Sequence, residues 1–220
     1  DYSRLFESFI LINKSRVIVE LGVSHGETTI TLCRAAEKTG GKVIGIDNWE
    51  TCGLWGQFTF GPDFTKENVE NFLNKNGCTN YTLYKKNTTD LDYPEFLKKI
   101  VGKKIDFAFI DACHSYQGIT NDFRAVYPLL SDIGIIAFHD TQCVDGCREF
   151  MLDLRTIYYD GSYDVFDLFG GGGDQKLGIS FLIKKQFPVL KNSITSICGS
   201  PHTPDEILQR EQQLYLNEIS

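Results

Sequence analysis

The chain has 220 residues, of which 42% are hydrophobic and 23% are charged, and its formal net charge at pH 7 is −7. This length and composition are typical of one globular domain with a substantial core, so we expect residues 1–220 to form a single domain. The negative balance argues against sequence-independent binding to nucleic-acid phosphates or to anionic lipid, and no apolar stretch approaches the roughly 20 residues that span a bilayer. We therefore expect neither nucleic acid nor a membrane as a partner.

The cysteines indicate a reducing compartment. There are seven of them, an odd number, spread along the chain rather than arranged as a disulfide framework. The first residues contain neither an initiator Met nor the apolar segment of a signal peptide, so we expect a truncated or processed chain. The sequence predicts a cytoplasmic protein with reduced thiols, and it is compatible with a homodimer.

Apolar periodicity and glycine stops divide the chain into alternating helices and strands. The chain opens with a lead-in helix within residues 1–14, whose Leu5, Phe6, Phe9 and Ile12 share one face and should pack on the sheet edge. Seven strands are predicted, at residues 17–21, 43–47, 81–85, 105–110, 133–138, 163–168 and 179–183. Further helices are predicted at residues 25–38, 64–76, 93–101, 117–130 and 145–155, with a terminal helix at 203–216.

Strands that alternate with helices predict a parallel sheet with helices on both faces. The last two strands follow one another without a helix, which predicts an antiparallel hairpin at one edge. The expected fold class is α/β, with a doubly wound, mostly parallel, seven-stranded Rossmann-like sheet. Four consecutive glycines, Gly170–Gly173, predict a mobile connection within the hairpin.

Residues 48–62 follow no helical or strand period and carry four large aromatic side chains. A loop of this length in a compact domain often serves as a lid or as the wall of a binding site. The alternative is a loop that packs its aromatic side chains on the core. The sequence leaves both interpretations open.

The first strand runs directly into a turn with two glycines. We expect Gly22 to supply a tight turn after residues 17–21, and Gly26 to let the next helix approach a ligand without a side chain in between. A strand, a glycine turn and a helix start in this order are typical of a nucleotide-type binding corner.

Polar side chains stand at the carboxyl ends of four predicted strands. In an open α/β sheet, ligands bind outside these ends, so acids gathered there predict a functional cleft. The residues concerned are Glu20, Asp47, Asp111 and the pair His139 and Asp140.

The residues of the corner favour S-adenosylmethionine over a nicotinamide dinucleotide. Ser24 stands where dinucleotide sites usually have their middle glycine, and Glu20 would lie beside a pyrophosphate. The same carboxylate would be favourable beside the ammonium of an amino-acid moiety, whose own carboxylate the Thr28 hydroxyl and the helix start can hold. Asp47 suits the ribose hydroxyls of either cofactor.

Four motifs in order resemble class I S-adenosylmethionine-dependent methyltransferases. They are Glu20-Leu-Gly-Val-Ser-His-Gly-Glu-Thr28, Ile46-Asp-Asn-Trp49, Phe109-Ile-Asp-Ala-Cys-His-Ser-Tyr116 and Ile136-Ala-Phe-His-Asp140. The resemblance covers about residues 15–185 and is closest to the branch of metal-dependent catechol-type and macrolide-sugar O-methyltransferases. It implies a Rossmann-like methyltransferase fold, with S-adenosylmethionine as the cofactor.

The resemblance also implies roles for single residues. The residues that match the cofactor-binding positions of the family are Glu20, Gly22, Val23, Ser24, Gly26, Thr28, Asp47, Asn48, Thr88 and Asp111. Among them, Asp47 matches the acid that binds the ribose, with Asn48 beside it. Thr88 falls where these enzymes contact the adenine, but the acid often found there is only approximated by Asp90.

A divalent cation is implied by the metal-dependent members of this branch. Asp111, His139 and Asp140 occupy the positions of their metal ligands, but His139 departs from the usual oxygen ligand. A site with one imidazole and two carboxylates suits Mn²⁺, Fe²⁺ or Zn²⁺ as well as Mg²⁺. The alternative is that His139 and Asp140 only cap a loop.

His114 stands where the catechol-type enzymes place a catalytic lysine. A neutral imidazole there can take the proton from an acceptor hydroxyl, which would make Asp111, His114 and His139 the catalytic group. The alternative is that His114 only hydrogen-bonds a neighbouring carboxylate. A structural zinc site that includes Cys113, Cys143 or Cys147 is a further alternative, although their spacing lacks a second ligand pair.

The sequence thus predicts an enzyme that methylates a hydroxyl of a small-molecule acceptor. The alternatives are an oxidoreductase that uses a nicotinamide dinucleotide, and a metal-binding relative of the fold with hydroxylase-like activity. The sequence does not identify the acceptor.

Overall fold

The computed structural model describes residues 2–52, 58–59, 64–168 and 178–185. All of them lie within one compact unit of the chain, residues 1–186. The helices are α1 Ser3–Ile12, α2 Glu27–Thr39, α3 Lys66–Lys75, α4 Tyr93–Val101, α5 Tyr116–Val126, the short 3₁₀ helix η1 Tyr127–Leu129, and α6 Asp145–Arg155. The strands are β1 Val17–Leu21, β2 Lys42–Asp47, β3 Thr51–Cys52, β4 Phe58–Thr59, β5 Tyr81–Lys85, β6 Ile105–Ile110, β7 Leu130–His139, β8 Tyr163–Leu168 and β9 Ile179–Lys184.

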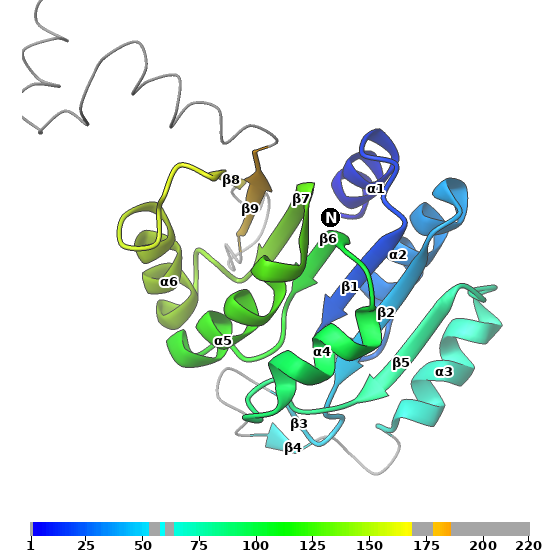
Figure 1. The fold of residues 1–220 in the computed structure, drawn as a ribbon. Coiled ribbons are helices and arrows are strands. Elements are labelled where there is room, and N and C mark those ends of the chain that lie inside the picture. The colour runs from blue at the N-terminus through cyan, green and yellow to red at the C-terminus, as the bar shows by residue number, and fades with distance from the viewer. Residues whose placement is uncertain (1, 53–57, 60–63, 169–177, 186–220) are drawn as a thin grey trace, which may run out of the picture. The chain divides into compact units, whose positions relative to one another are not determined.

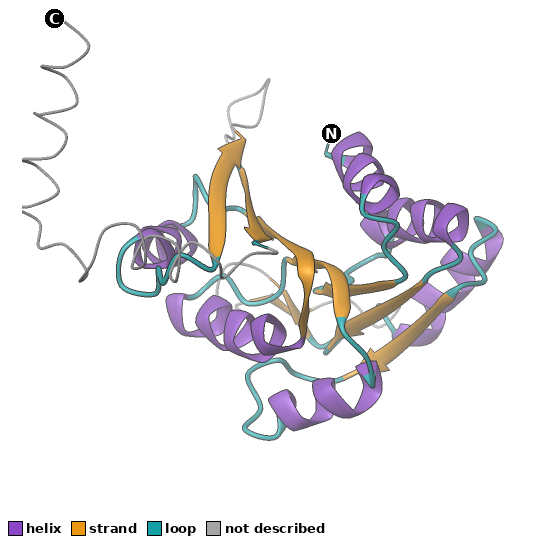
Figure 2. Cartoon of the chain, turned by 45° about the horizontal axis from the view of Figure 1, so that its top comes forward, coloured by secondary structure: helices purple, strands orange, loops and turns teal. Residues whose placement is uncertain are grey.

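The main sheet has seven strands in the order β5-β2-β1-β6-β7-β9-β8. The first five of these strands are parallel to their neighbours, whereas β9 is antiparallel to β7 and pairs with β8 in an antiparallel hairpin. The predicted fold class, a doubly wound and mostly parallel sheet with an antiparallel edge hairpin, is confirmed. Figure 1 shows the sheet between its helices, and Figure 2 shows the same arrangement by secondary structure.

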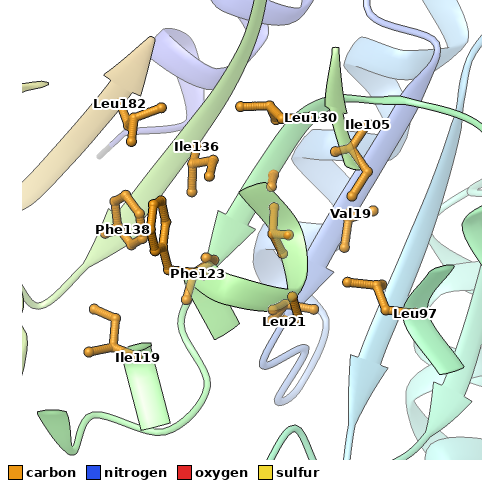
Figure 3. Close-up of a cluster of buried hydrophobic side chains, with 14 of the residues drawn as sticks. Val19, Leu21, Leu97, Ile105, Ile119, Phe123, Leu130, Ile136, Phe138 and Leu182 are labelled. Carbon is orange, nitrogen blue, oxygen red and sulfur yellow. The ribbon is translucent and has the colours of Figure 1, made fainter. Parts of the chain in front are cut away.

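Two apolar clusters, one on each face of the sheet, hold the helices in place. On one face, α4, α5 and α6 contribute Leu97, Phe123 and Phe150 to a cluster with Leu21 and Phe138 from the strands. Figure 3 shows part of this cluster. The other face is covered by α1, α2 and α3. A sheet buried on both faces explains why every residue of β1 is buried and why all of them except Glu20 are apolar.

The lead-in helix packs on a face of the sheet and not on its edge. The ring of Phe6 lies 4.9 Å from that of Phe109 on β6, and the ring of Phe9 lies 5.0 Å from that of Phe181 on β9. Ile12, predicted on the buried face, is 76% exposed. A helix that crosses several strands buries the residues above them, and its last turn extends into solvent.

The helix predicted at residues 117–130 ends earlier, at Val126. Pro128 has no backbone N–H for a helical hydrogen bond, and the chain continues as the single turn η1. The next strand therefore begins at Leu130, three residues before the predicted start, and ends at His139.

The aromatic loop contains a small hairpin that its sequence did not indicate, because β3 and β4 pair through Thr51 and Thr59. Trp49 is 5% exposed, so this side chain follows the core-packing interpretation. The glycine run 170–173 and the predicted helix at residues 203–216 lie outside the described residues. Among the helices of the described part, none is long and apolar enough to cross a membrane.

Candidate functional site

The turn after β1 is fixed by close backbone packing at Gly22. Its N–H donates to the carbonyl of Ile46 at 2.9 Å, and the N–H of Asp111 donates to the carbonyl of Leu21 at 2.8 Å. Gly22 has a φ of +87°, and a Cβ there would lie 2.1 Å from the carbonyl oxygen of Asp111. Only glycine fits, and this packing brings the ends of β1, β2 and β6 together.

Gly26 lies against the side chains of α3. It precedes α2 with a φ of +85°, and a Cβ there would lie 3.1 Å from Val69 and 3.2 Å from Leu73 on α3. The expectation that Gly26 also clears space for a ligand stays a prediction. The missing side chain makes room for the packing of α3.

Asp47 holds the glycine corner through its carboxylate. One oxygen accepts the N–H of Ser24 at 2.8 Å, and the other accepts the N–H of Trp49 at 2.7 Å. Burial raises the pKa of Asp47, and hydrogen bonds from four backbone N–H groups oppose the increase. Ser24 and Trp49 have φ values of +51° and +48°, so two non-glycine residues are held in the left-handed region at this point. Such strain clusters at functional sites.

Glu20 lies beneath the corner with no exposed surface. One carboxylate oxygen accepts the hydroxyl of Thr29 at 2.6 Å, and the other has no hydrogen-bond partner. Burial raises the pKa of Glu20 to about 8, although the hydrogen bond from Thr29 lowers it. The hydroxyl that reaches Glu20 belongs to Thr29 and not to its neighbour Thr28. Val23, next to the corner, is also buried.

The loop after β5 carries the residues predicted at the adenine. Thr88 is 6% exposed and therefore belongs to the buried layer beneath the loop. The side-chain oxygen of Asn87 accepts hydrogen bonds from the N–H and the hydroxyl of Thr89, at 3.1 and 2.9 Å. On the neighbouring loop after β2, the side-chain oxygen of Asn48 accepts the N–H of Glu50 at 2.9 Å. Both loops are thus closed by local turns.

Asp111, His139 and Asp140 come together at the ends of β6 and β7. Each offers one ligand atom, and the three atoms all lie within 4.8 Å of one another. Asp140 has a φ of +57°, a further left-handed residue at this edge of the sheet. The grouping fits a divalent cation by donor chemistry, with one imidazole nitrogen and two carboxylate oxygens. It is the only group of this kind among the described residues, and no cysteine belongs to it.

His114 lies between the two carboxylates of this cluster. Its Nε2 is 3.1 Å from an oxygen of Asp111 and 3.0 Å from an oxygen of Asp140, whereas Nδ1 is buried without a partner. The Nδ1 of His139 is 3.4 Å from Asp111 and 3.1 Å from Asp140. The structure therefore brings together all four residues predicted at the metal and catalytic positions.

The charges of this cluster shift the pKa values of its members. Burial alone would lower the pKa values of His114 and His139, but the hydrogen bonds and charges of Asp111 and Asp140 outweigh it and raise them to about 9 and about 10. Burial alone would raise the pKa of Asp140, but the two histidines hold it well below its usual range. In the protein alone, the two imidazoles are thus shifted towards their protonated forms.

Two residues near the cluster were not predicted from the sequence. The ring of Tyr2 lies 6.1 Å from that of His139, and burial and then the charge of Asp140 raise its pKa. Asp122 on α5 is fully buried and interacts electrostatically with His114. An acid on the apolar face of a predicted helix was the signal for Asp122, whereas no local signal places Tyr2 beside a distant strand.

Comparisons with known proteins bear on the family and the fold. A family model described as a methyltransferase domain matches residues 19–141, a range that contains the corner and the cluster. No curated protein sequence matches the chain.

Several solved structures have the same fold. The O-methyltransferase TomG from Streptomyces achromogenes, in complex with SAM, has a TM-score of 0.65 and 18% identity, over 83% of this chain and 79% of that chain. An O-methyltransferase from Bacillus cereus in complex with SAH has a TM-score of 0.61 and 20% identity, over 83% and 80%. An rRNA methylase from Streptococcus thermophilus has a TM-score of 0.58 and 14% identity, over 84% and 95%. The fold therefore does not determine the acceptor.

Replacement of Glu20 by Gln should remove a pH-dependent contribution to stability. An unfolded Glu ionises near about pH 4.3, whereas folded Glu20 keeps its proton to about pH 8. The unfolded state therefore loses its proton first, and stability falls as pH rises through this window. The free energy of unfolding in urea should be measured for Glu20→Gln and the wild type at about pH 5 and about pH 9. Between these pH values, the stability of the variant relative to the wild type should increase by at least about 2 kcal/mol. A constant difference would contradict the assignment.

Proposed function

The chain belongs to a family of methyltransferase domains, and from this membership we propose that it transfers a methyl group from S-adenosylmethionine to a hydroxyl of a small-molecule acceptor. The observation that carries the proposal is the position of Asp47 and the glycine corner beside the Asp111, His114, His139 and Asp140 cluster, at one edge of the sheet. An acceptor held between them would meet a methyl donor and a proton acceptor at once.

The corner supplies the groups that the cofactor needs. We propose that Asp47 accepts the ribose hydroxyls beside Asn48, because its carboxylate is already fixed at the corner by backbone N–H groups. We propose that Glu20 lies beneath the methionine part, whose ammonium would favour the ionised carboxylate and hydrogen-bond, directly or through a water, the oxygen that has no partner in the protein alone. Thr28 at the start of α2 and Thr88 in the loop after β5 are proposed at the carboxylate and the adenine. S-adenosylmethionine supplies an electrophilic methyl group.

We propose His114 as the general base for the acceptor hydroxyl. In the protein alone, Asp111 and Asp140 keep its imidazole protonated, because its pKa is about 9. A cation held by the same two carboxylates would offset their charge and return His114 to the neutral form that accepts a proton. The action of His114 as a base would therefore depend on the binding of a cation by Asp111 and Asp140.

We propose that Asp111, His139 and Asp140 hold a divalent cation. When bound, the cation supplies positive charge that favours the ionised form of the acceptor oxygen. The imidazole of His139 makes Mn²⁺ or Fe²⁺ as suitable as Mg²⁺, since a nitrogen donor is a poor ligand for Mg²⁺. The competing interpretation, in which these residues only pair with one another, predicts no binding of a cation.

The chemical class of the acceptor is proposed from charge. The net charge of −7 disfavours a nucleic-acid acceptor, although an rRNA methylase shares the fold. No observation favours the nicotinamide alternative, and Ser24 with its strained backbone stands where such sites need glycine. A cytoplasmic location and a homodimer stay predictions.

Calorimetric titration tests the cofactor assignment. S-adenosylmethionine and its demethylated product should bind, and Asp47→Ala should weaken both by at least about tenfold, because the buried ribose hydroxyls lose their acceptor. NAD is the control ligand and should not bind. Binding of NAD alone would exclude the proposed activity. A screen of hydroxylated metabolites with a labelled methyl donor then identifies the acceptor.

Replacement of His114 by Ala tests the general base. With the acceptor identified, turnover should fall by about 10² or more, while the affinity for S-adenosylmethionine should stay within about twofold. The separation of the two effects is expected because the imidazole of His114 lies against Asp111 and Asp140, whereas Asp47 is held by Ser24 and Trp49. Wild-type turnover of the variant across about pH 6 to 9 would remove His114 from the mechanism.

Direct measurement of Mn²⁺ binding, by calorimetry or electron paramagnetic resonance, tests the metal site. Asp111→Ala should lose the bound ion, and His139→Asp should shift the preference towards Mg²⁺, since an oxygen replaces a nitrogen donor. Asp145→Ala is the matched control, because Asp145 is an exposed acid paired with Arg148 on α6. Equal binding by the Asp111 variant and the wild type would place the ion elsewhere.

A further inference from the structure

A buried carboxyl group, that of Asp122, interacts with His114 of the cluster but makes no hydrogen bond of good geometry. Asp122 on α5 has no exposed surface, and neither of its carboxylate oxygens has a hydrogen-bond partner of good geometry among the described residues. Acids are almost never fully buried unless they are paired, because the charged form loses its hydration. Asp122 therefore needs an explanation other than the packing of α5.

The groups around Asp122 come from three separate segments. The hydroxyl of Thr88, in the loop after β5, lies near enough to lower its pKa, and so does the charge of His114, in the loop after β6. Tyr93, the first residue of α4, is fully buried, and its pKa is raised by burial and then by the charge of Asp122. The pKa of Asp122 itself is raised to about 7 by burial.

Two of these neighbours also have buried polar atoms without a hydrogen-bond partner. The hydroxyl of Tyr93 and the Nδ1 of His114 are buried without partners, as are both oxygens of Asp122. Four unpartnered polar atoms in one region are costly, and an apolar set of similar shape would be more stable. Ordered water between these groups would satisfy them, since buried water typically bridges several polar atoms.

We propose that Asp122 is a positioning residue that holds Thr88 and His114 in place through this buried polar junction. Resting on the proposed function, the junction connects the loop that binds the adenine to the loop that carries the general base. One carboxyl group, anchored on α5 and backed by Tyr93, then sets the distance between the two loops. The polar residues are kept at a cost in stability because the two loops must move as one unit.

Asp122 should differ from a residue that only stabilises the fold in how its replacement affects loop exchange and stability. Asp122→Leu keeps a similar volume and removes the buried carboxyl, so unfolding in urea should require the same or a higher urea concentration than for the wild type. Hydrogen exchange should nevertheless become faster in residues 86–92 and 111–115, because their common anchor is lost. A residue that only supports the fold would not raise exchange in these loops while stability is kept.

Hydrogen exchange by mass spectrometry, with calorimetric titration of S-adenosylhomocysteine, tests the proposal on the full chain. Asp122→Leu should show faster exchange in both loops and should bind S-adenosylhomocysteine about tenfold more weakly. Asp122→Asn should keep most of the wild-type protection from exchange and most of the wild-type affinity, since its amide fits the same junction. Asp106→Asn is the matched control, because Asp106 accepts the N–H groups of Arg16 and Val17 at the other end of the sheet. It should change neither measurement.

Unchanged exchange in both loops of Asp122→Leu would overturn the proposal. If that variant fails to fold, Tyr93→Phe removes one hydroxyl of the junction and should still raise exchange in residues 86–92, and unchanged exchange there would overturn it equally. Failure of the wild type to bind S-adenosylhomocysteine would instead refute the proposed function. The exchange data would still decide whether Asp122 joins the two loops.

Discussion

The close packing of Gly22 against the backbone of Asp111 is the constraint on which the site depends. A Cβ at Gly22 would lie 2.1 Å from the Asp111 carbonyl oxygen, so β1 and β6 can end side by side only with glycine there. The same turn is tied to β2 by the hydrogen bond from Gly22 to Ile46. Because parallel strands end at one edge, this contact brings Asp47 and Asp111 to the same edge of the sheet. The chemistry of the site follows from this backbone arrangement.

Around the candidate site, burial raises the pKa of some carboxyl groups, whereas nearby positive charge lowers the pKa of another. Burial raises the pKa values of Glu20 and Asp122 to about 8 and about 7, and at Asp122 it outweighs the opposing charge of His114. Asp140 is also largely buried, but His114 and His139 hold its pKa well below the usual range. The carboxyl groups around the site thus suit different roles. The raised pKa values of Glu20 and Asp122 favour neutral, hydrogen-bonding groups, whereas the lowered pKa of Asp140 favours a charged group that can bind a cation.

The sequence predicted the parts that depend on local pattern. Apolar runs and alternating residues predicted every strand of the main sheet, and the acids at the strand ends predicted the edge at which the candidate site lies. The misses come from packing between distant segments. The helix predicted from His25 begins at Glu27, and the lead-in helix lies on a face of the sheet and not on its edge. Tyr2 reaches His139 only because α1 crosses the sheet, which no local pattern encodes.

A crystal structure with Mn²⁺ and S-adenosylhomocysteine, with anomalous diffraction to locate the metal, tests the central claim most directly. The account predicts a manganese peak among Asp111, His139 and Asp140, with the ribose of the cofactor product at Asp47. It also predicts that the sulfur of the product faces His114 across the space for the acceptor. A manganese peak elsewhere, or a product bound away from the corner after β1, would contradict it.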